Sequence, residues 1–298
     1  MTLVERTQRT ILLEDGRKLS YSDLGEPNGK PVFYFHGSPG SRLEAKIMHK
    51  KANEVGWRLI AVDRPGFGLS DFQPNRKITD WPKDINELAD LLEIENFSIF
   101  GVSTGASYAL ACASCLAERI NVVVTISALG SIEFRQKGLY LNHRFIFGMA
   151  KYFPLIFKTL FWWIRCRQLR KEDGGDRYLK LNFKNFSEKD RILLQDSDIL
   201  DTIAEAHCEA FRMGLKGITH EAKLLGNPWG FDLEKISKKL DIYLFHGGED
   251  KIAPVTATKG IERLLPRSKA TYFEDEGHVS LLANSEEEIF SILKIKKS

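Results

Sequence analysis

The stretch FSIFGVSTGA (Phe97–Ala106) decides the fold class of this chain. Its apolar first half predicts a buried strand, and the small residues that continue to Ala117 predict a helix. A chain that turns sharply from strand to helix holds its pivot residue in strained geometry, and the glycine on either side removes side chains that would collide. This strain pushes the Ser103 hydroxyl out at the carboxyl edge of the sheet. Ser103 is therefore a candidate nucleophile.

Short apolar runs on both sides of this stretch predict further buried strands. They are Pro31–Phe35, Arg58–Val62, Val122–Ile126, Ile242–His246 and Ala270–Phe273. Helical patterns lie between them, at Leu43–Val55, Ile78–Glu93, Thr104–Leu116, Val255–Leu265 and Glu286–Leu293. Residues 8–14 and 17–24 alternate around Asp15-Gly16, which predicts a hairpin. A hairpin followed by alternating strands and helices is typical of an α/β fold, with a mostly parallel sheet and helices on both faces.

The alternation stops between about residues 130 and 230, where the pattern predicts helices and loops. We therefore divide the chain into an α/β core, residues 1–129 and 231–298, and an inserted helical cap or lid, residues 130–230. Aromatic residues gather in Phe134–Trp163, and Pro154 is expected to split this segment into two helices. Cations recur there every seven residues, at Arg144, Lys151, Lys158 and Arg165. The aromatic surface suits an apolar substrate or packing against the core, and the cationic face leaves contact with a membrane surface open.

Composition excludes several classes of function. The 298 residues are 43% hydrophobic and 28% charged, which is an ordinary globular balance, and the net charge of +3 is too small to indicate a nucleic-acid partner. No apolar stretch is long enough to insert stably into a membrane, and MTLVERTQRT lacks the features of a signal peptide, so a cytoplasmic location is expected. Four cysteines are too few for a disulfide framework. No nucleotide-binding or metal motif is present in the sequence, so neither a cofactor nor a metal is expected.

A serine hydroxyl is a weak nucleophile at its normal pKa, so it needs a base, and the base needs an orienting carboxylate. Two late strand ends supply these groups. The strand predicted at Ile242–His246 continues into GGEDKIAP, and the strand predicted at Ala270–Phe273 continues into EDEGH. We assign Asp250 as the acid and His278 as the base.

Other carboxylates and histidines are weaker candidates. Glu249 is adjacent to Asp250, but neighbouring side chains in a loop point in different directions. Asp275 and Glu276 are too close to His278 in sequence to reach its ring comfortably. The remaining histidines lie in predicted helices, in the cap or beside a strand-end glycine, where packing or surface positions are expected: His49, His143, His207, His220 and His246.

The loop HGSPG (His36–Gly40) directly follows the strand predicted at Pro31–Phe35. A tetrahedral intermediate needs two N–H donors at its oxyanion. We predict that the backbone N–H groups of Ser38 and Thr104 form this oxyanion hole. The side chain of His36 is not required for that task, so we interpret His36 as a structural loop residue.

Taken together, these motifs resemble the α/β-hydrolase fold family. The strings HGSPG, DRPGFGLS, GVSTGA, HGGEDKIAP and DEGH carry the resemblance, which covers residues 31–130 and 240–285. Their serine, aspartate and histidine follow one another in that family's order. The resemblance implies an eight-stranded, mostly parallel sheet and serine-dependent acyl transfer to water without a cofactor. Members that open epoxides or displace halide carry aspartate at the position of Ser103, so the serine argues against both of these activities.

HGSPG is also similar to the HGGPG of proline iminopeptidases. Those enzymes usually have glycine before and tryptophan after the serine, where this chain has Val102 and Thr104. The sequence therefore predicts a carboxylesterase-like serine hydrolase that acts on a small, apolar acyl substrate. An aminopeptidase of the proline iminopeptidase type, and a non-catalytic ligand-binding or sensor protein on the same scaffold, are the alternatives. A homodimer remains open.

Overall fold

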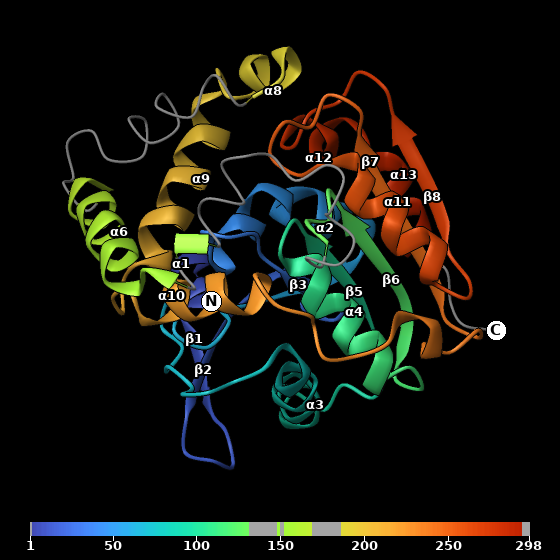
Figure 1. Cartoon of the computed structure of the whole chain (residues 1–298). Coiled ribbons are helices and arrows are strands. Elements are labelled where there is room, and N and C mark those ends of the chain that lie inside the picture. Colours follow the sequence, from blue (N-terminus) through green and yellow to red (C-terminus); the bar gives the residue numbers. More distant parts are fainter. Residues whose placement is uncertain (1, 131–147, 150–151, 169–185, 294–298) are drawn as a thin grey trace.

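A computed structural model describes residues 2–130, 148–149, 152–168 and 186–293 (Figure 1). These residues form an eight-stranded sheet in the order β1-β2-β4-β3-β5-β6-β7-β8. β2 pairs antiparallel with both β1 and β4, and every other pairing is parallel. The strands are β1 (Arg9–Leu12), β2 (Lys18–Gly25), β3 (Lys30–Phe35), β4 (Trp57–Val62), β5 (Phe97–Val102), β6 (Ile120–Ile126), β7 (Asp241–Gly247) and β8 (Lys269–Phe273).

The structure confirms each predicted strand to within about two residues, and it confirms the mostly parallel α/β architecture. The predicted hairpin is present, because Leu12 pairs with Lys18 and Gly16 turns the chain at a φ of 82°. Only glycine adopts that conformation without strain.

Helices cover both faces of the sheet. They are α1 (Leu3–Thr7), η1 (Arg42–Met48), α2 (His49–Val55), η2 (Ile78–Asp80), α3 (Trp81–Leu91), α4 (Gly105–Cys115), η4 (Leu233–Lys235), α11 (Val255–Leu264), α12 (Ser280–Asn284) and α13 (Glu286–Leu293). On β3, Phe33 and Phe35 join the core shared with α3, α4 and α11, while Val32 and Tyr34 join the core shared with α2 and α13. This alternation is the two-residue period of a strand buried on both faces.

The helix predicted at Leu43–Val55 differs in its first half. The chain begins there with the 3-10 helix η1, which has three residues per turn, and becomes α-helical only at His49. Three-residue spacing places Arg42, Ala45 and Met48 on one buried face. An α-helical pattern in the sequence does not distinguish these two geometries.

Between β6 and β7 the described residues contain helices and no strand, as the sequence predicts. These helices are α6 (Pro154–Gln168), α8 (Glu188–Leu193), α9 (Ser197–Ala210) and α10 (Lys216–Leu225). Figure 1 shows α6, α8 and α9 on one side of the molecule, away from α11 and β8. Pro154 begins α6, where the sequence predicted a break.

The aromatic segment is described only in part. Phe157 is fully buried and packs with Leu129, Met149 and Leu225, so one side of α6 contributes to a core cluster. Other large apolar side chains of this segment are exposed, among them Leu155 and Trp162. Of the four predicted cations, Arg144, Lys151 and the side chain of Arg165 lie outside the described residues, and Lys158 is exposed.

Candidate active site

The turn around Ser103 has the strained geometry that its sequence predicts. Ser103 lies between β5 and α4 with a φ of 55°, although it is not glycine. A Cβ atom on Gly105 would lie 2.1 Å from the carbonyl oxygen of Phe35, and one on Gly101 would lie 2.7 Å from the carbonyl oxygen of Gly105. Glycine is thus required at both positions for β3, β5 and α4 to approach each other. Ser103 itself is 8% exposed.

Asp250 and His278 meet at the ends of β7 and β8. Nδ1 of His278 lies 2.8 Å from Oδ2 of Asp250. The other carboxylate oxygen, Oδ1, accepts the N–H groups of Ile252 and Ala253, both at 2.8 Å. A carboxylate can only accept, so the proton of a neutral His278 ring is on Nδ1, and Nε2 is left to accept a proton.

The two groups shift each other's pKa. Burial alone would lower the pKa of His278, but the charge and hydrogen bond of Asp250, followed by the charges of Asp190 and Glu44, raise it above its ordinary value. Burial alone would raise the pKa of Asp250, but the charge and hydrogen bond of His278 lower it. An ionised Asp250 therefore stabilises the imidazolium that forms when His278 takes up a proton.

Gly37 lies beside both Ser103 and Glu44. A Cβ atom on Gly37 would lie 3.6 Å from Cβ of Ser103 and 3.7 Å from Oε1 of Glu44, and the Glu44 charge acts on His278. Within the described residues no hydrogen bond joins the Ser103 hydroxyl to the His278 ring. In enzymes without substrate such contacts are often long and tighten when substrate binds.

The loop that carries Ser38 is held by Arg64. The Arg64 guanidinium donates to the carbonyl oxygens of His36 at 2.5 Å and of Gly37 at 2.9 Å. A trans peptide points its C=O and N–H in opposite directions, so fixing the oxygen of Gly37 also fixes the N–H of Ser38. Thr104, the other predicted donor, precedes α4, and its hydroxyl lies 3.4 Å from the same guanidinium.

His36 has the structural role expected for it. Its Nδ1 lies 2.7 Å from the oxygen of Gly37, and its Nε2 accepts the N–H of Arg64 at 3.3 Å. The ring is fully buried, and this burial, together with the charge of Arg64, lowers the pKa of His36 to about 3. A neutral ring whose nitrogens are both engaged does not serve as the base.

Glu221, on α10, anchors Arg64 from the segment between β6 and β7. Its carboxylate lies 2.6 Å from Nε and 3.1 Å from Nη2 of Arg64, and both side chains are fully buried. Tyr108 also donates to it, at 3.1 Å. Burial alone would raise the pKa of Glu221, but the charge and hydrogen bond of Arg64, the charge of Arg76 and a hydrogen bond from the Ser38 side chain lower it to about 2.

We expect Glu221→Gln to lower the free energy of unfolding by about 3–5 kcal/mol at pH 7, because it leaves the buried Arg64 charge uncompensated. The lowered pKa of Glu221 means that its ionised form stabilises the fold fully above pH 4.5 and loses this effect as pH falls toward 2. The difference between wild type and variant should therefore shrink at acid pH. Urea denaturation followed by circular dichroism at pH 7 and pH 4 measures both quantities.

Glu205→Gln is the control, since Glu205 is 52% exposed and its pair with Lys46 contributes little. Equal losses in the two variants would contradict the prediction.

The alternative residues are either exposed or engaged in other contacts. Glu276 pairs with Lys189, at 2.6 Å, and Glu249 is exposed. His246 lies 3.6 Å from Asp250, but its ring is fully buried and contacts Thr258 and the carbonyl oxygen of Ala253. His143 lies outside the described residues. Of the residues that the sequence did not single out, Glu44, Arg64, Asp190 and Glu221 contact the loops that carry the predicted site residues.

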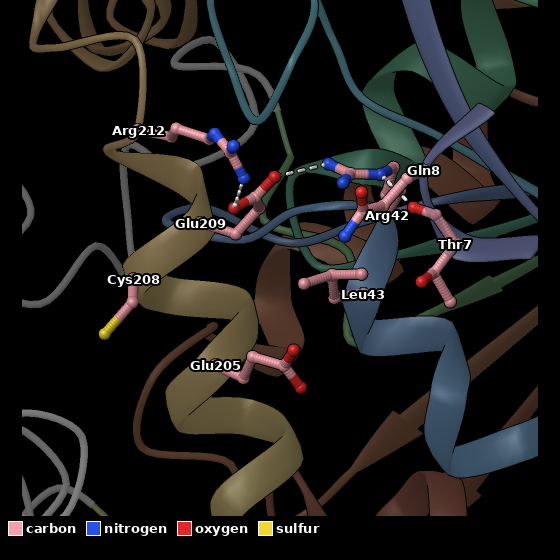
Figure 2. A pocket seen from close by; sticks show the side chains of 8 residues that line it. All are labelled: Thr7, Gln8, Arg42, Leu43, Glu205, Cys208, Glu209 and Arg212. Carbon is pink, nitrogen blue, oxygen red and sulfur yellow. Dashed lines mark hydrogen bonds and ion pairs between the residues drawn. The ribbon is translucent and has the colours of Figure 1, made fainter. Parts of the chain in front are cut away.

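A cavity of about 370 Å³ lies between η1 and α9, away from Ser103. It is lined by Thr7, Gln8, Arg42, Leu43, Glu205, Cys208, Glu209 and Arg212 (Figure 2). The buried Arg42 donates to Asp63 at 2.6 Å and to Glu209 at 2.8 Å, so its charge is balanced within the protein.

The described residues contain no group of side chains arranged to hold a metal ion. They also contain no helix with the length and apolar character needed to cross a membrane.

A family model, curated relatives and solved structures were compared with this chain, and all three point to one fold family. The model of a family described as alpha/beta hydrolase fold matches residues 30–285. A putative proline iminopeptidase of Mycoplasma genitalium is 27% identical over 298 residues, which cover 94% of each chain. A proline iminopeptidase of Xylella fastidiosa is 33% identical over 119 residues, which cover 38% of this chain and 37% of that protein. The solved structure of an esterase from Exiguobacterium antarcticum has a TM-score of 0.71 at 22% identity and covers 97% of this chain and 100% of its own. The chain belongs to the α/β-hydrolase fold family.

Proposed function

We propose that this protein is a serine hydrolase that cleaves an ester or related acyl bond of a small, apolar substrate through an acyl-enzyme. The observation that carries the proposal is the Asp250–His278 hydrogen bond, which leaves Nε2 of His278 free to accept a proton at the strand ends. The strained turn at Ser103 presents a hydroxyl at the same edge of the sheet. A cap formed by residues 130–230 would cover this edge and select the substrate.

The proposed reaction has two half-reactions. His278 takes the proton of Ser103 while Oγ attacks the acyl carbon, and the N–H groups of Ser38 and Thr104 bind the negative oxygen. The intermediate then collapses, and His278 returns the proton to the leaving alcohol. Water, deprotonated by the same imidazole, attacks the acyl-enzyme and releases the acid and free Ser103. Asp250 keeps the ring in one tautomer throughout.

A panel of ester, thioester, lactone and aminoacyl amide substrates tests this proposal, together with labelling by a fluorophosphonate probe. We expect turnover of short or medium acyl esters and covalent labelling that maps to Ser103. Labelling without turnover of any substrate would favour acyl transfer to another acceptor. A chain that neither reacts with the probe nor turns over any substrate would instead support the ligand-binding alternative.

Glu44 favours aminopeptidase activity as a second candidate function. Its carboxylate accepts the hydroxyl of Tyr34 and the N–H of Gly37, both at 3.0 Å, and it is half-buried near Ser103. Burial raises the pKa of Glu44. Among the described residues it forms no ion pair, so a substrate ammonium would supply the missing cation. The relatives named as proline iminopeptidases support the same candidate.

We expect Glu44→Gln to separate the two candidates. If the acyl group carries a cationic amine, the variant should lower kcat/KM for an aminoacyl p-nitroanilide by about 10- to 150-fold, the range for a hydrogen bond to a charged group. It should leave turnover of a neutral p-nitrophenyl ester within about twofold at a pH well above the pKa of His278, where loss of the Glu44 charge does not change the protonation of the base. Glu54→Gln, which replaces an exposed carboxylate on α2, is the control. A similar loss for both substrates would show that Glu44 supports the loop and does not recognise charge.

A further inference from the structure

Asp190 lies on α8, in the segment between β6 and β7, yet its carboxylate contacts the loop that carries His278. It is completely buried. Its Oδ2 accepts the backbone N–H of His278 at 3.1 Å, and its Oδ1 accepts those of Val279 at 2.9 Å and Ser280 at 2.8 Å. Three consecutive N–H groups of one loop thus converge on a single side chain that is 88 positions or more away in sequence.

The whole loop from Glu276 to Ser280 rests against the first turn of α8. A Cβ atom on Gly277 would lie 2.2 Å from both the Ser187 hydroxyl and the Asp190 carboxylate, so only glycine permits this approach. Ser187 in turn exchanges hydrogen bonds with Asp190, its N–H donating at 3.1 Å to the carboxylate. The carboxylate is therefore fixed from its own helix while it binds the loop.

These contacts determine where the ring of His278 points. Asp250 holds the ring at Nδ1, at 2.8 Å, and Asp190 holds the backbone of the same residue at its N–H, at 3.1 Å. With only the first contact, the loop could move while the ring pivots about Asp250. With both, the direction of Nε2 is set, and proton transfer depends on that direction.

Asp190 also contributes charge. The ionisable groups that act on His278 are Asp250 and His246 from the β7 side, Asp190 from α8 and Glu44 from η1. The three carboxylates stabilise the imidazolium and raise the pKa of His278 against the effect of burial. Removal of the Asp190 charge therefore favours the neutral ring.

We propose that Asp190 is a positioning residue, supplied by the segment between β6 and β7, which fixes the His278 loop so that Nε2 faces Ser103. The inference rests on the proposed function, because it assigns His278 as the base. It also means that α8 cannot leave the core without releasing the base from its position.

The test is Asp190→Asn. The amide keeps the shape and one acceptor. With that acceptor on Val279 and Ser280, its NH2 group faces the N–H groups of His278 and Ser187, and both of these hydrogen bonds are lost. We expect kcat to fall on the order of 10²-fold with little change in KM. The acid limb of the pH profile should move to lower pH, because the pKa of His278 falls. Lys189→Met is the matched control: within the described residues Lys189 contacts the same loop through the partly exposed pair with Glu276, and the variant should retain the wild-type kcat.

The outcomes separate the inference from the proposed function. If Asp190→Asn lowers only the melting temperature, with wild-type kcat and pH profile in the folded protein, the inference is wrong. If wild type shows neither turnover nor fluorophosphonate labelling, the proposed function fails instead. Imidazole NMR titration still tests the inference in that case: we expect a lower pKa for His278 in Asp190→Asn than in wild type, and an unchanged pKa would overturn it.

Discussion

Replacement of Ser103 by alanine is expected to lower kcat on the order of 10⁶-fold while the protein remains folded. The loss is this large because the nucleophile, the base and the orienting acid act as one unit, so removal of the first makes the other two useless. The fold should be unaffected because, among the described residues, the Ser103 hydroxyl makes no hydrogen bond that stabilises it. Alanine also tolerates the φ of 55° about as well as serine does.

The measurement is hydrolysis of the best ester or amide in the panel, with circular dichroism as the check on folding. Fluorophosphonate labelling should disappear in Ser103→Ala. Ser114→Ala, near the end of the same helix α4, is the control and should retain both activity and labelling. Residual activity within tenfold of wild type would exclude Ser103 as the nucleophile.

Replacement of Asp250 by asparagine is expected to lower kcat on the order of 10⁴-fold, through the tautomer of His278. Oδ1 of Asp250 accepts the N–H groups of Ile252 and Ala253, so the asparagine oxygen should occupy that position. Its NH2 group then faces Nδ1 of His278 as a donor. The ring must accept there and carry its proton on Nε2, where it can no longer take the proton of Ser103.

Glu249→Gln is the matched control for this variant, because it makes the same chemical change at the adjacent, exposed position. It should leave kcat within about twofold of wild type. Because the wrong tautomer is the cause, the loss in Asp250→Asn should diminish at high pH. Hydroxide can then take the proton of Ser103 in place of the imidazole. A large loss of kcat in Glu249→Gln and none in Asp250→Asn would show that Glu249, and not Asp250, is the acid that orients His278.

The parts of this molecule that the sequence predicts are those that short segments determine. The turn at Ser103 depends on two glycines within two residues of it, and the assignment of Asp250 and His278 depends on the apolar strands just before them. A buried strand has a continuous apolar pattern, so its end can be located from the residues alone.

The parts that were missed depend on residues distant in sequence. Glu221 meets Arg64 from 157 positions away, and in its own segment it is one carboxylate in a polar stretch of helix. Asp190 likewise follows Ser187 in the pattern of an ordinary helix start, and nothing in that pattern indicates the His278 loop. Such contacts between distant residues can be identified only from the three-dimensional structure.

Carboxylates on α8, α9 and α10 each hold a different part of the core: Asp190 the His278 loop, Glu209 the Arg42 side chain and Glu221 the Arg64 side chain. Engineers who wish to alter specificity by grafting this segment from a relative must therefore transplant its core partners with it. A chimera that lacks them would leave the buried Arg64 charge unpaired and would release the backbone of the His278 loop, whereas Arg42 would keep its pair with Asp63. For the same reason, we expect substitutions of these three carboxylates to covary with substitutions of the core residues that they contact.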